Sequence, residues 1–105
     1  MQSAACLLVH ATVRDDADIE KFDKWYETEH LPDAKKAFGV ARAWRCWSLT
    51  SPREHYAFYE FESDGAAMAI TESDAIKELV AEFDRVWGDR VSRTREILSV
   101  AGRLG

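Results

Sequence analysis

His30 is the residue whose type and position best suit chemistry. It lies in the segment Glu29-His30-Leu31-Pro32, and Pro32 biases the residue before it away from helical dihedral angles, which predicts a break or kink at His30–Leu31. A titratable side chain at such a break can project into a cavity, and a neutral histidine can move protons at neutral pH. His30 is therefore the candidate catalytic residue. The alternative role is structural, in which the imidazole caps free carbonyl groups at the helix end.

The other two histidines lie on different segments. His10 lies in an alternating segment with Leu8 and Thr12 on its face, where a polar ring needs a hydrogen-bond partner or an adjoining cavity. We expect His10 either to line a ligand pocket or to be a satisfied core or interface histidine. His55 directly follows a turn signal and is expected at the surface. The three histidines lack HxH and HxxxH spacing, so a metal site would need tertiary assembly and none is predicted.

Aromatic side chains are abundant enough to wall a pocket for a planar apolar ligand. The chain has four tryptophans, three tyrosines and five phenylalanines. Ligand contact is expected at Trp25, Tyr26 and Tyr59, and either Tyr26 or His10 could assist His30 in moving a proton. Most of the other aromatic residues are expected in the core.

Segments with the periodicity of regular structure position these residues. Alternating residues predict strands over 5–13, 40–50, 54–62 and 91–101, of which the middle two form a hairpin. Helical stripes predict a helix from near residue 18 that restarts after Pro32 and ends at Gly39, and a tract from residue 63 that restarts near Ser73 and ends at Gly88. This order is that of a ferredoxin-like βαββαβ domain of the α+β class, with a four-stranded antiparallel sheet and both helices on one face. At 105 residues the chain has room for one domain, residues 1–105.

The sheet face without helices predicts a partner. Leu8, Tyr56 and Phe58 can populate that face, and packing two sheets face to face would bury them. We therefore expect a homodimer. In this topology the second and fourth strands lie at the sheet edges. Edge protection and dimer pairing explain the arginines of these strands more economically than recognition of an anionic ligand; they are Arg42, Arg45, Arg93 and Arg95.

Charge and composition exclude several classes of function. Fourteen basic and nineteen acidic residues give a net charge of −5, which disfavours a nucleic-acid partner. The sequence has neither an apolar run long enough to span a membrane nor the pattern of a signal peptide, so a cytoplasmic protein is expected. Cys6 and Cys46 lack CxxC spacing and are expected as small buried hydrophobic residues. Because the motifs of serine hydrolases, P-loop enzymes, zincins and nicotinamide enzymes are missing, simple proton transfer is the expected chemistry.

The segment FDKWYETEHLP (residues 22–32), followed by Phe38-Gly39-Val40 and later by YAFYEF (residues 56–61), resembles the EthD-like branch of the dimeric α/β-barrel superfamily. The resemblance spans most of the chain, and its specific part is WYxxEHLP with the glycine that follows. It implies a dimeric α/β barrel with a pocket between helices and sheet in each subunit and His30 near that pocket. Relatives in the superfamily include cofactor-free oxygenases, isomerases, dehydratase-like tailoring enzymes and haem-handling proteins.

Two functions follow as expectations from these observations. The first is a small-molecule enzyme or tailoring protein that acts on an aromatic or polyketide-like compound by cofactor-free proton transfer. The second is a non-catalytic dimeric protein, ligand-binding or stress-associated, that uses the same pocket.

Overall fold

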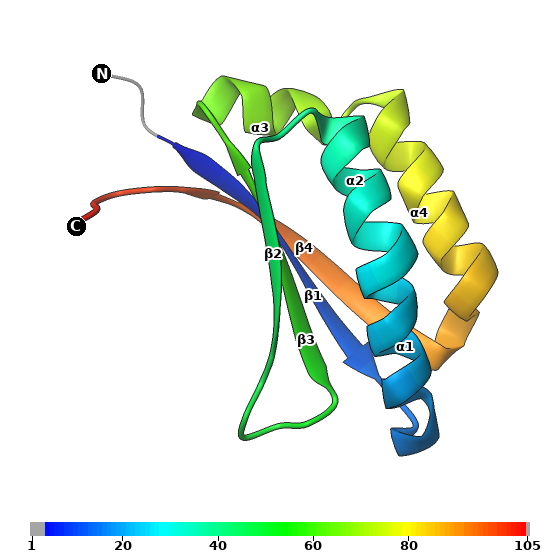
Figure 1. Ribbon diagram of the computed structural model, residues 1–105. Coiled ribbons are helices and arrows are strands. Elements are labelled where there is room, and N and C mark those ends of the chain that lie inside the picture. Colours follow the sequence, from blue (N-terminus) through cyan, green and yellow to red (C-terminus); the bar gives the residue numbers. More distant parts are fainter. Residues whose placement is uncertain (1–3, 105) are drawn as a thin grey trace.

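The first strand in the chain is one of the two central strands of the sheet. In the computed structural model, which describes residues 4–104, β1 (Ala5–Val13) pairs with both β3 (Glu54–Phe61) and β4 (Val91–Ser99), and β2 (Arg42–Trp47) pairs with β3. All pairs are antiparallel and the strand order is β2-β3-β1-β4. The expected sheet is thereby confirmed, with β2 and β4 as edge strands; residues 1–3 and 105 of the expected domain lie outside the described part (Figure 1).

The two faces of the sheet follow the alternation in β1. Ala5, Leu7, Ala11 and Val13 are buried beneath the helices, while the even-numbered residues of β1 point to the other face. The hairpin of β2 and β3 is confirmed, and its pairing places Trp44 opposite Phe58 on the open face. Cys6 and Cys46 also lie on the open face. Cys6 is half-buried and Cys46 is exposed, so the expectation of a buried cysteine was wrong for Cys46.

The first helical segment runs through Pro32 without a break. α1 (Ile19–Trp25) and α2 (Leu31–Phe38) are joined by a π-helical turn over Tyr26–His30, in which the Leu31 N–H donates to the Tyr26 carbonyl. The expected break at His30–Leu31 is absent, since His30 and Leu31 keep right-handed helical dihedral angles. The physical reason is that a π turn accommodates the missing N–H of Pro32 by widening the helix by one residue. The expected restart is confirmed, because α2 begins at Leu31 with Pro32 in its first turn.

Capping residues set the limits of the helices that follow. Ser63 caps α3 (Asp64–Ile70) and Ser73 caps α4 (Asp74–Trp87), as its Oγ accepts from the Ile76 N–H. Gly39 ends α2 in the left-handed conformation with φ of 68°, which glycine adopts without a steric cost. The expected restart near Ser73 and the expected stop at Gly39 are both confirmed.

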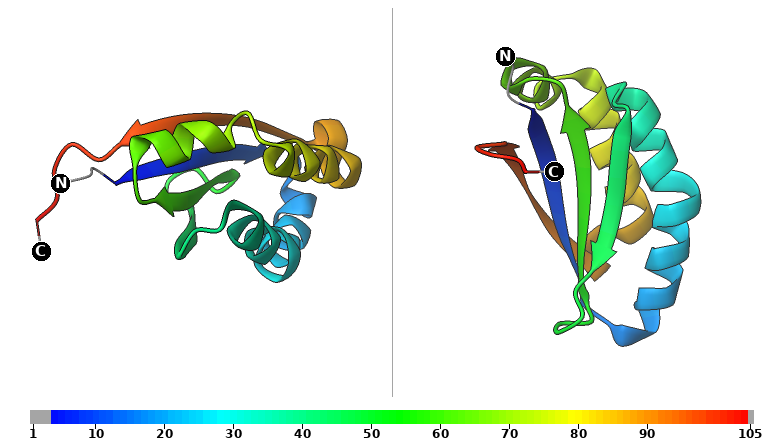
Figure 2. Two further views of the ribbon diagram at one scale, coloured as in Figure 1. Left: turned by 90° about the horizontal axis from the view of Figure 1, so that it is seen from above. Right: turned by 60° about the vertical axis from the view of Figure 1, so that its left-hand side comes forward.

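The helices pack on one face of the sheet, as Figure 2 shows from two further directions. Aromatic residues fill the layer between them: Phe22 of α1 contacts Phe83 and Trp87 of α4 with ring centroids 5.9 and 5.3 Å apart. Phe22 itself is completely buried. Within residues 4–104, no helix combines the length and the apolar character that crossing a membrane would require.

Candidate functional site

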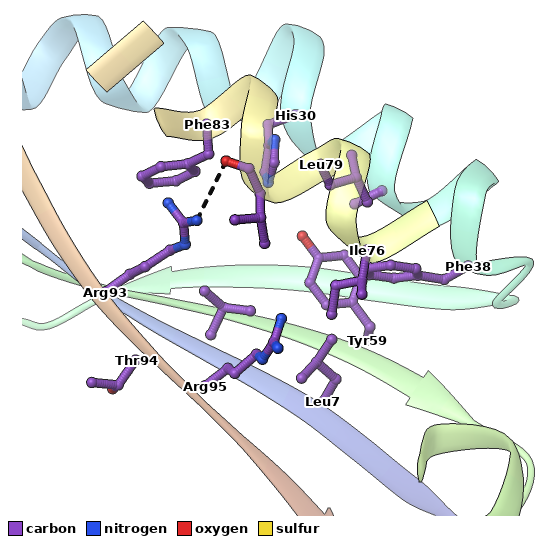
Figure 3. Close-up of a pocket in the computed structure, with 13 residues that line it drawn as sticks. Leu7, His30, Phe38, Tyr59, Ile76, Leu79, Phe83, Arg93, Thr94 and Arg95 are labelled. Atoms are coloured by element: carbon purple, nitrogen blue, oxygen red, sulfur yellow. Dashed lines mark hydrogen bonds between the residues drawn. The ribbon is translucent and has the colours of Figure 1, made fainter. Parts of the chain in front are cut away.

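A cavity of about 230 Å³ lies between α2, α4 and the strands β1 and β4 (Figure 3). Its wall is mostly apolar. The apolar lining residues are Leu7, Val9, Ala34, Phe38, Ile76, Leu79, Val80 and Phe83. The polar lining residues are His30, Tyr59, Arg93, Thr94 and Arg95. Since a cavity of about 150 Å³ holds benzene, this one has room for a ligand of one or two rings.

The π turn places His30 in the wall of this cavity. His30 is the last residue of the turn, is 9% exposed, and stacks on Trp25 with ring centroids 4.8 Å apart. Tyr26 and Phe83 contact the same imidazole edge-on at 4.8 and 5.5 Å. Single π turns inside α-helices often occur at functional sites because they redirect one side chain relative to the rest of the helix. The expectation that His30 adjoins a cavity thus agrees with the geometry, although a widened helix rather than a broken one achieves it.

His30 is held in its neutral form. Burial, and then the positive charge of Arg93, lower the pKa of His30 from 6.5 to about 4. No other described residue forms a hydrogen bond with the imidazole, so its nitrogens are not engaged by a protein group. A neutral imidazole facing a cavity can accept a proton from a bound compound or a hydrogen bond from it.

Tyr59 brings a second polar group to the cavity. Its hydroxyl lies 3.2 Å from that of Tyr26, and both side chains are almost completely buried. Burial raises the pKa of Tyr26 to about 12 and that of Tyr59 well above 10, so both stay neutral phenols. One hydroxyl of the pair donates to the other. When Tyr26 is the donor, the proton of Tyr59 is free for a ligand in the cavity.

Two arginines of β4 also line the cavity, which the sequence analysis missed. The Arg93 guanidinium lies 4.0 Å from the centre of the Phe83 ring and donates to Asp84 at 3.1 Å and to the Val80 carbonyl at 3.5 Å. Arg95 is two residues along and therefore on the same face. Edge protection alone does not account for them, because the odd-numbered residues of β4 pair with the helix-facing residues of β1. Val91 is an apolar residue of the same odd-numbered set, which indicates that this set faces the helices.

A partly buried polar network lies beneath α1. Arg45 of β2 donates from Nε to Nε2 of His55 at 3.1 Å, from Nη1 to Glu27 at 2.8 Å and from Nη2 to Asp23. Trp47 donates from Nε1 to the same oxygen of Asp23 at 2.7 Å. Arg45 therefore has a structural role in this network, and its side chain is only 13% exposed.

His55 belongs to this network, so the expectation that it would be exposed was wrong. It is completely buried, because its position in β3 faces the helices, and burial together with the charge of Arg45 lowers its pKa to about 3. Since Nε2 accepts from Arg45, the proton of the neutral ring is on Nδ1. That nitrogen has no partner among the described residues. The Tyr26 ring lies against His55 at 4.5 Å, so the network supports the helix turn that carries His30.

His10 is not brought to the cavity. It lies on the open face of the sheet, where Nε2 is 2.6 Å from Glu54 and the ring stacks on Tyr56 at 4.5 Å. Thr12 donates to the same oxygen of Glu54 at 2.7 Å. The geometry thus matches the alternative of a satisfied histidine. Its parity in β1 explains the placement, since the cavity is lined by Leu7 and Val9 of the same strand.

The remaining candidates take different positions. Tyr59 lines the cavity, whereas Trp25 and Tyr26 form the layer directly behind His30. For the part of the chain between residues 4 and 104, no three histidine, cysteine or acidic side chains come close enough together to hold a metal ion.

Comparison with known proteins bears on the fold. No protein-family model matches the sequence, and no curated protein matches it. Among solved structures, SnoaB, a cofactor-independent oxygenase from Streptomyces nogalater, is 8% identical with a TM-score of 0.70, and the match covers 96% of each chain.

Two further structures are similar. A putative antibiotic biosynthesis monooxygenase from Nitrosomonas europaea is 15% identical with a TM-score of 0.69, covering 100% of this chain and 97% of that one. An ethyl tert-butyl ether d (EthD) family protein from Bacillus halodurans is 14% identical with a TM-score of 0.61, covering 87% of this chain and 96% of that one. At the level of the fold, the resemblance to EthD-like proteins is therefore confirmed. The chain has the ferredoxin-like α+β fold that is found in solved antibiotic biosynthesis monooxygenase-like and EthD family structures.

Proposed function

We propose that the protein is a small-molecule tailoring enzyme that binds a small aromatic compound in the cavity and uses His30 to move a proton without a cofactor. The observation that carries this proposal is the position of His30: its imidazole is in the cavity wall, neutral, and not hydrogen-bonded to any other described residue. The cavity volume of about 230 Å³ favours one or two rings over a larger polyketide.

The chemistry follows from the environment of His30. The imidazole takes a proton from an acidic C–H or O–H of the substrate, and the electron pair left behind spreads onto a substrate oxygen as an enolate or phenolate. The imidazolium is disfavoured by burial and by Arg93, so it returns the proton to another atom of the substrate. The net result is an isomerisation that needs no oxidant. The neutral hydroxyl of Tyr59 can donate a hydrogen bond to the anionic oxygen.

A panel of enolisable ketones and phenols with one or two rings tests this function. Abstraction of a proton from carbon in D₂O exchanges substrate hydrogen for deuterium, which mass spectrometry and NMR detect even when no net product forms. We expect His30→Gln to lower the exchange rate by about 10²-fold or more while the fold and ligand binding persist. Arg42→Gln, on the opposite sheet face, is the control and should leave exchange unchanged. Undiminished exchange in His30→Gln would rule out His30 as the base.

A non-catalytic ligand-binding or stress-associated protein is the second candidate. The observation in its favour is that, within residues 4–104, no carboxylate hydrogen-bonds to His30 to orient it, whereas bases in many enzymes have such a partner. Binding of the panel without any exchange or conversion would select this candidate.

The assembly that we propose is a homodimer of single-domain chains, located in the cytoplasm, in which the open sheet faces of two copies pack together. Trp44 stacks on Phe58 on that face with ring centroids 5.2 Å apart, and Trp44 is 40% exposed. Leu8 and Tyr56 belong to the same face and are half-buried. Exposed apolar surface of this kind is typical of a protein interface.

A further inference from the structure

The charges around the cavity all have one sign. Five of the lining residues are polar, two of these are arginines, and none of the thirteen lining residues among the described positions is acidic. The chain as a whole has a net charge of −5. A pair of guanidinium groups beside an apolar cavity is therefore a local positive site on a negative protein, and it attracts anions to that place.

The two arginines differ in how they are held. Arg93 is compensated by Asp84, and its guanidinium is fixed against the Phe83 ring. Arg95 forms no ion pair or hydrogen bond with any residue between 4 and 104 and is exposed. Figure 3 shows both side chains on the cavity side of β4. Successive residues on one strand face are about 7 Å apart, so a ligand held by Arg95 stays close to the fixed charge of Arg93.

The shape of the site determines which part of a ligand each group meets. Leu7, Val9 and Ile76 form an apolar wall, which suits a ring system. Arg95 is exposed at the mouth, whereas His30 is buried. A planar guanidinium matches a carboxylate through two parallel hydrogen bonds. An aromatic acid can therefore keep its carboxylate at the mouth while its rings extend inward.

We propose that the ligand of this cavity is a small aromatic carboxylate, with one or two rings, whose acid group is bound by Arg95. The inference rests on the proposed function in taking this cavity as the ligand site, but it does not require any proton transfer. Arg95 is then the residue that selects anionic over neutral compounds. Arg93 lies nearby but is already paired with Asp84, and Thr94 adds no charge.

Two probes of nearly the same shape test the proposal: 1-naphthoate, which is an anion at neutral pH, and 1-naphthamide, which is neutral. Isothermal titration calorimetry with the wild-type protein should give an affinity at least about tenfold higher for naphthoate, since hydrogen bonds to charged groups are worth about 1.5–3 kcal/mol. Raising the ionic strength should weaken naphthoate binding only. Benzoate and benzamide repeat the comparison with one ring.

Variants test whether Arg95 causes the preference for naphthoate over naphthamide. We expect Arg95→Gln to weaken naphthoate binding about tenfold or more and to leave naphthamide binding unchanged, and Arg95→Lys to fall between. Arg42→Gln removes the same charge from the opposite face, where the Arg42 side chain is 70% exposed, and should change neither affinity. Thermal unfolding of each variant checks that it is folded.

The outcomes separate this proposal from the proposed function. Three results would each overturn the proposal, even if His30 proves to be a base. The first is equal affinity of the wild-type protein for the acid and the amide, and the second is no binding of either acid. The third is naphthoate binding that Arg95→Gln leaves intact. Selective naphthoate binding through Arg95, in a protein that catalyses no proton exchange, would support it and would reject only the catalytic function.

Discussion

The imidazole of His30 lies face to face with the indole of Trp25, with ring centroids 4.8 Å apart and planes 21° apart. The two residues are five positions apart along the helix, a spacing that brings side chains onto the same face only where the helix includes a π turn, since an ordinary α-helix aligns residues three and four apart. The indole covers one side of the imidazole while the cavity lies on another. Trp25 thus covers one face of His30 without lining the cavity itself.

Removal of the indole should therefore change the titration of His30. In Trp25→Leu we expect water to reach the imidazole, which relieves the burial that lowers its pKa, so the pKa rises from about 4 toward 6.5. An NMR titration of the His30 Cε1 proton measures it. Trp44→Leu, on the open face, is the control and should leave the His30 titration unchanged. An unaltered pKa in Trp25→Leu would mean that the helices alone keep the ring dry.

Two buried neutral histidines should also make stability depend on pH. The pKa values of His30 and His55 are about 4 and about 3 in the folded protein, against 6.5 when exposed. As the pH falls below 6.5 the unfolded chain binds protons that the folded chain does not. The contribution of the two histidines to the free energy of unfolding is therefore complete above pH 6.5 and is lost toward lower pH. Each group contributes about 1.4 kcal/mol per pH unit within that window.

Replacing one histidine should reduce this slope. Urea unfolding measured at several pH values from 6.5 down to 4.5 gives the free energy of unfolding, and we expect its pH slope in His30→Gln to be about half that of wild type. The slope is the readout, because the substitution also changes packing. An identical slope in the variant would show that His30 is protonated or exposed in the folded protein.

Much of the architecture could be predicted because it depends on local patterns. The alternation in residues 5–13 and 54–62 set both the strands and their faces, and Ser73 and Gly39 marked helix ends through their own backbone preferences. The position of His30 beside a cavity also followed from a local signal, the nearby Pro32. Pro32 predicts a broken helix, whereas the structure has a π turn. The energetic difference between the two depends on tertiary packing of Trp25 and Tyr26.

Local patterns indicate the sheet face of the charged residues but not the cavity that they meet. Whether Arg93 and Arg95 meet a cavity depends on the register of β4 against β1 and on how far α4 stands from the sheet, and a single sequence gives neither directly. His55 follows a turn, where exposure is the common outcome, but its position in β3 faces the helices, and Arg45 from the neighbouring strand donates to its Nε2. Long side chains that cross between elements are the features that sequence reasoning missed.

Arg45 and Arg42 offer a matched test of the structural role of Arg45, because they lie on the same strand and face opposite sides. The side chain of Arg45 is 13% exposed and that of Arg42 is 70% exposed. Arg45→Gln leaves His55 without its donor and two carboxylates without their cation, so we expect it to lower the free energy of unfolding by about 2 kcal/mol. Arg42→Gln should change it by less than about 0.5 kcal/mol. Equal effects in urea unfolding would show that Arg45 does not have the structural role assigned to it.

The proposed dimer predicts that a charge placed on the open sheet face will separate the two copies. Trp44→Glu puts a charge into the middle of the proposed interface, where desolvating it would be costly, so we expect analytical ultracentrifugation at micromolar concentration to show a monomer of 12.0 kDa in place of the dimer. Because Trp44 is already 40% exposed, the isolated subunit should remain folded, as circular dichroism can verify. Met68→Glu is the control, since Met68 is 56% exposed on α3, and it should remain a dimer. A wild-type protein that sediments as a monomer, or a Trp44→Glu variant that stays dimeric, would contradict packing of two copies through this face.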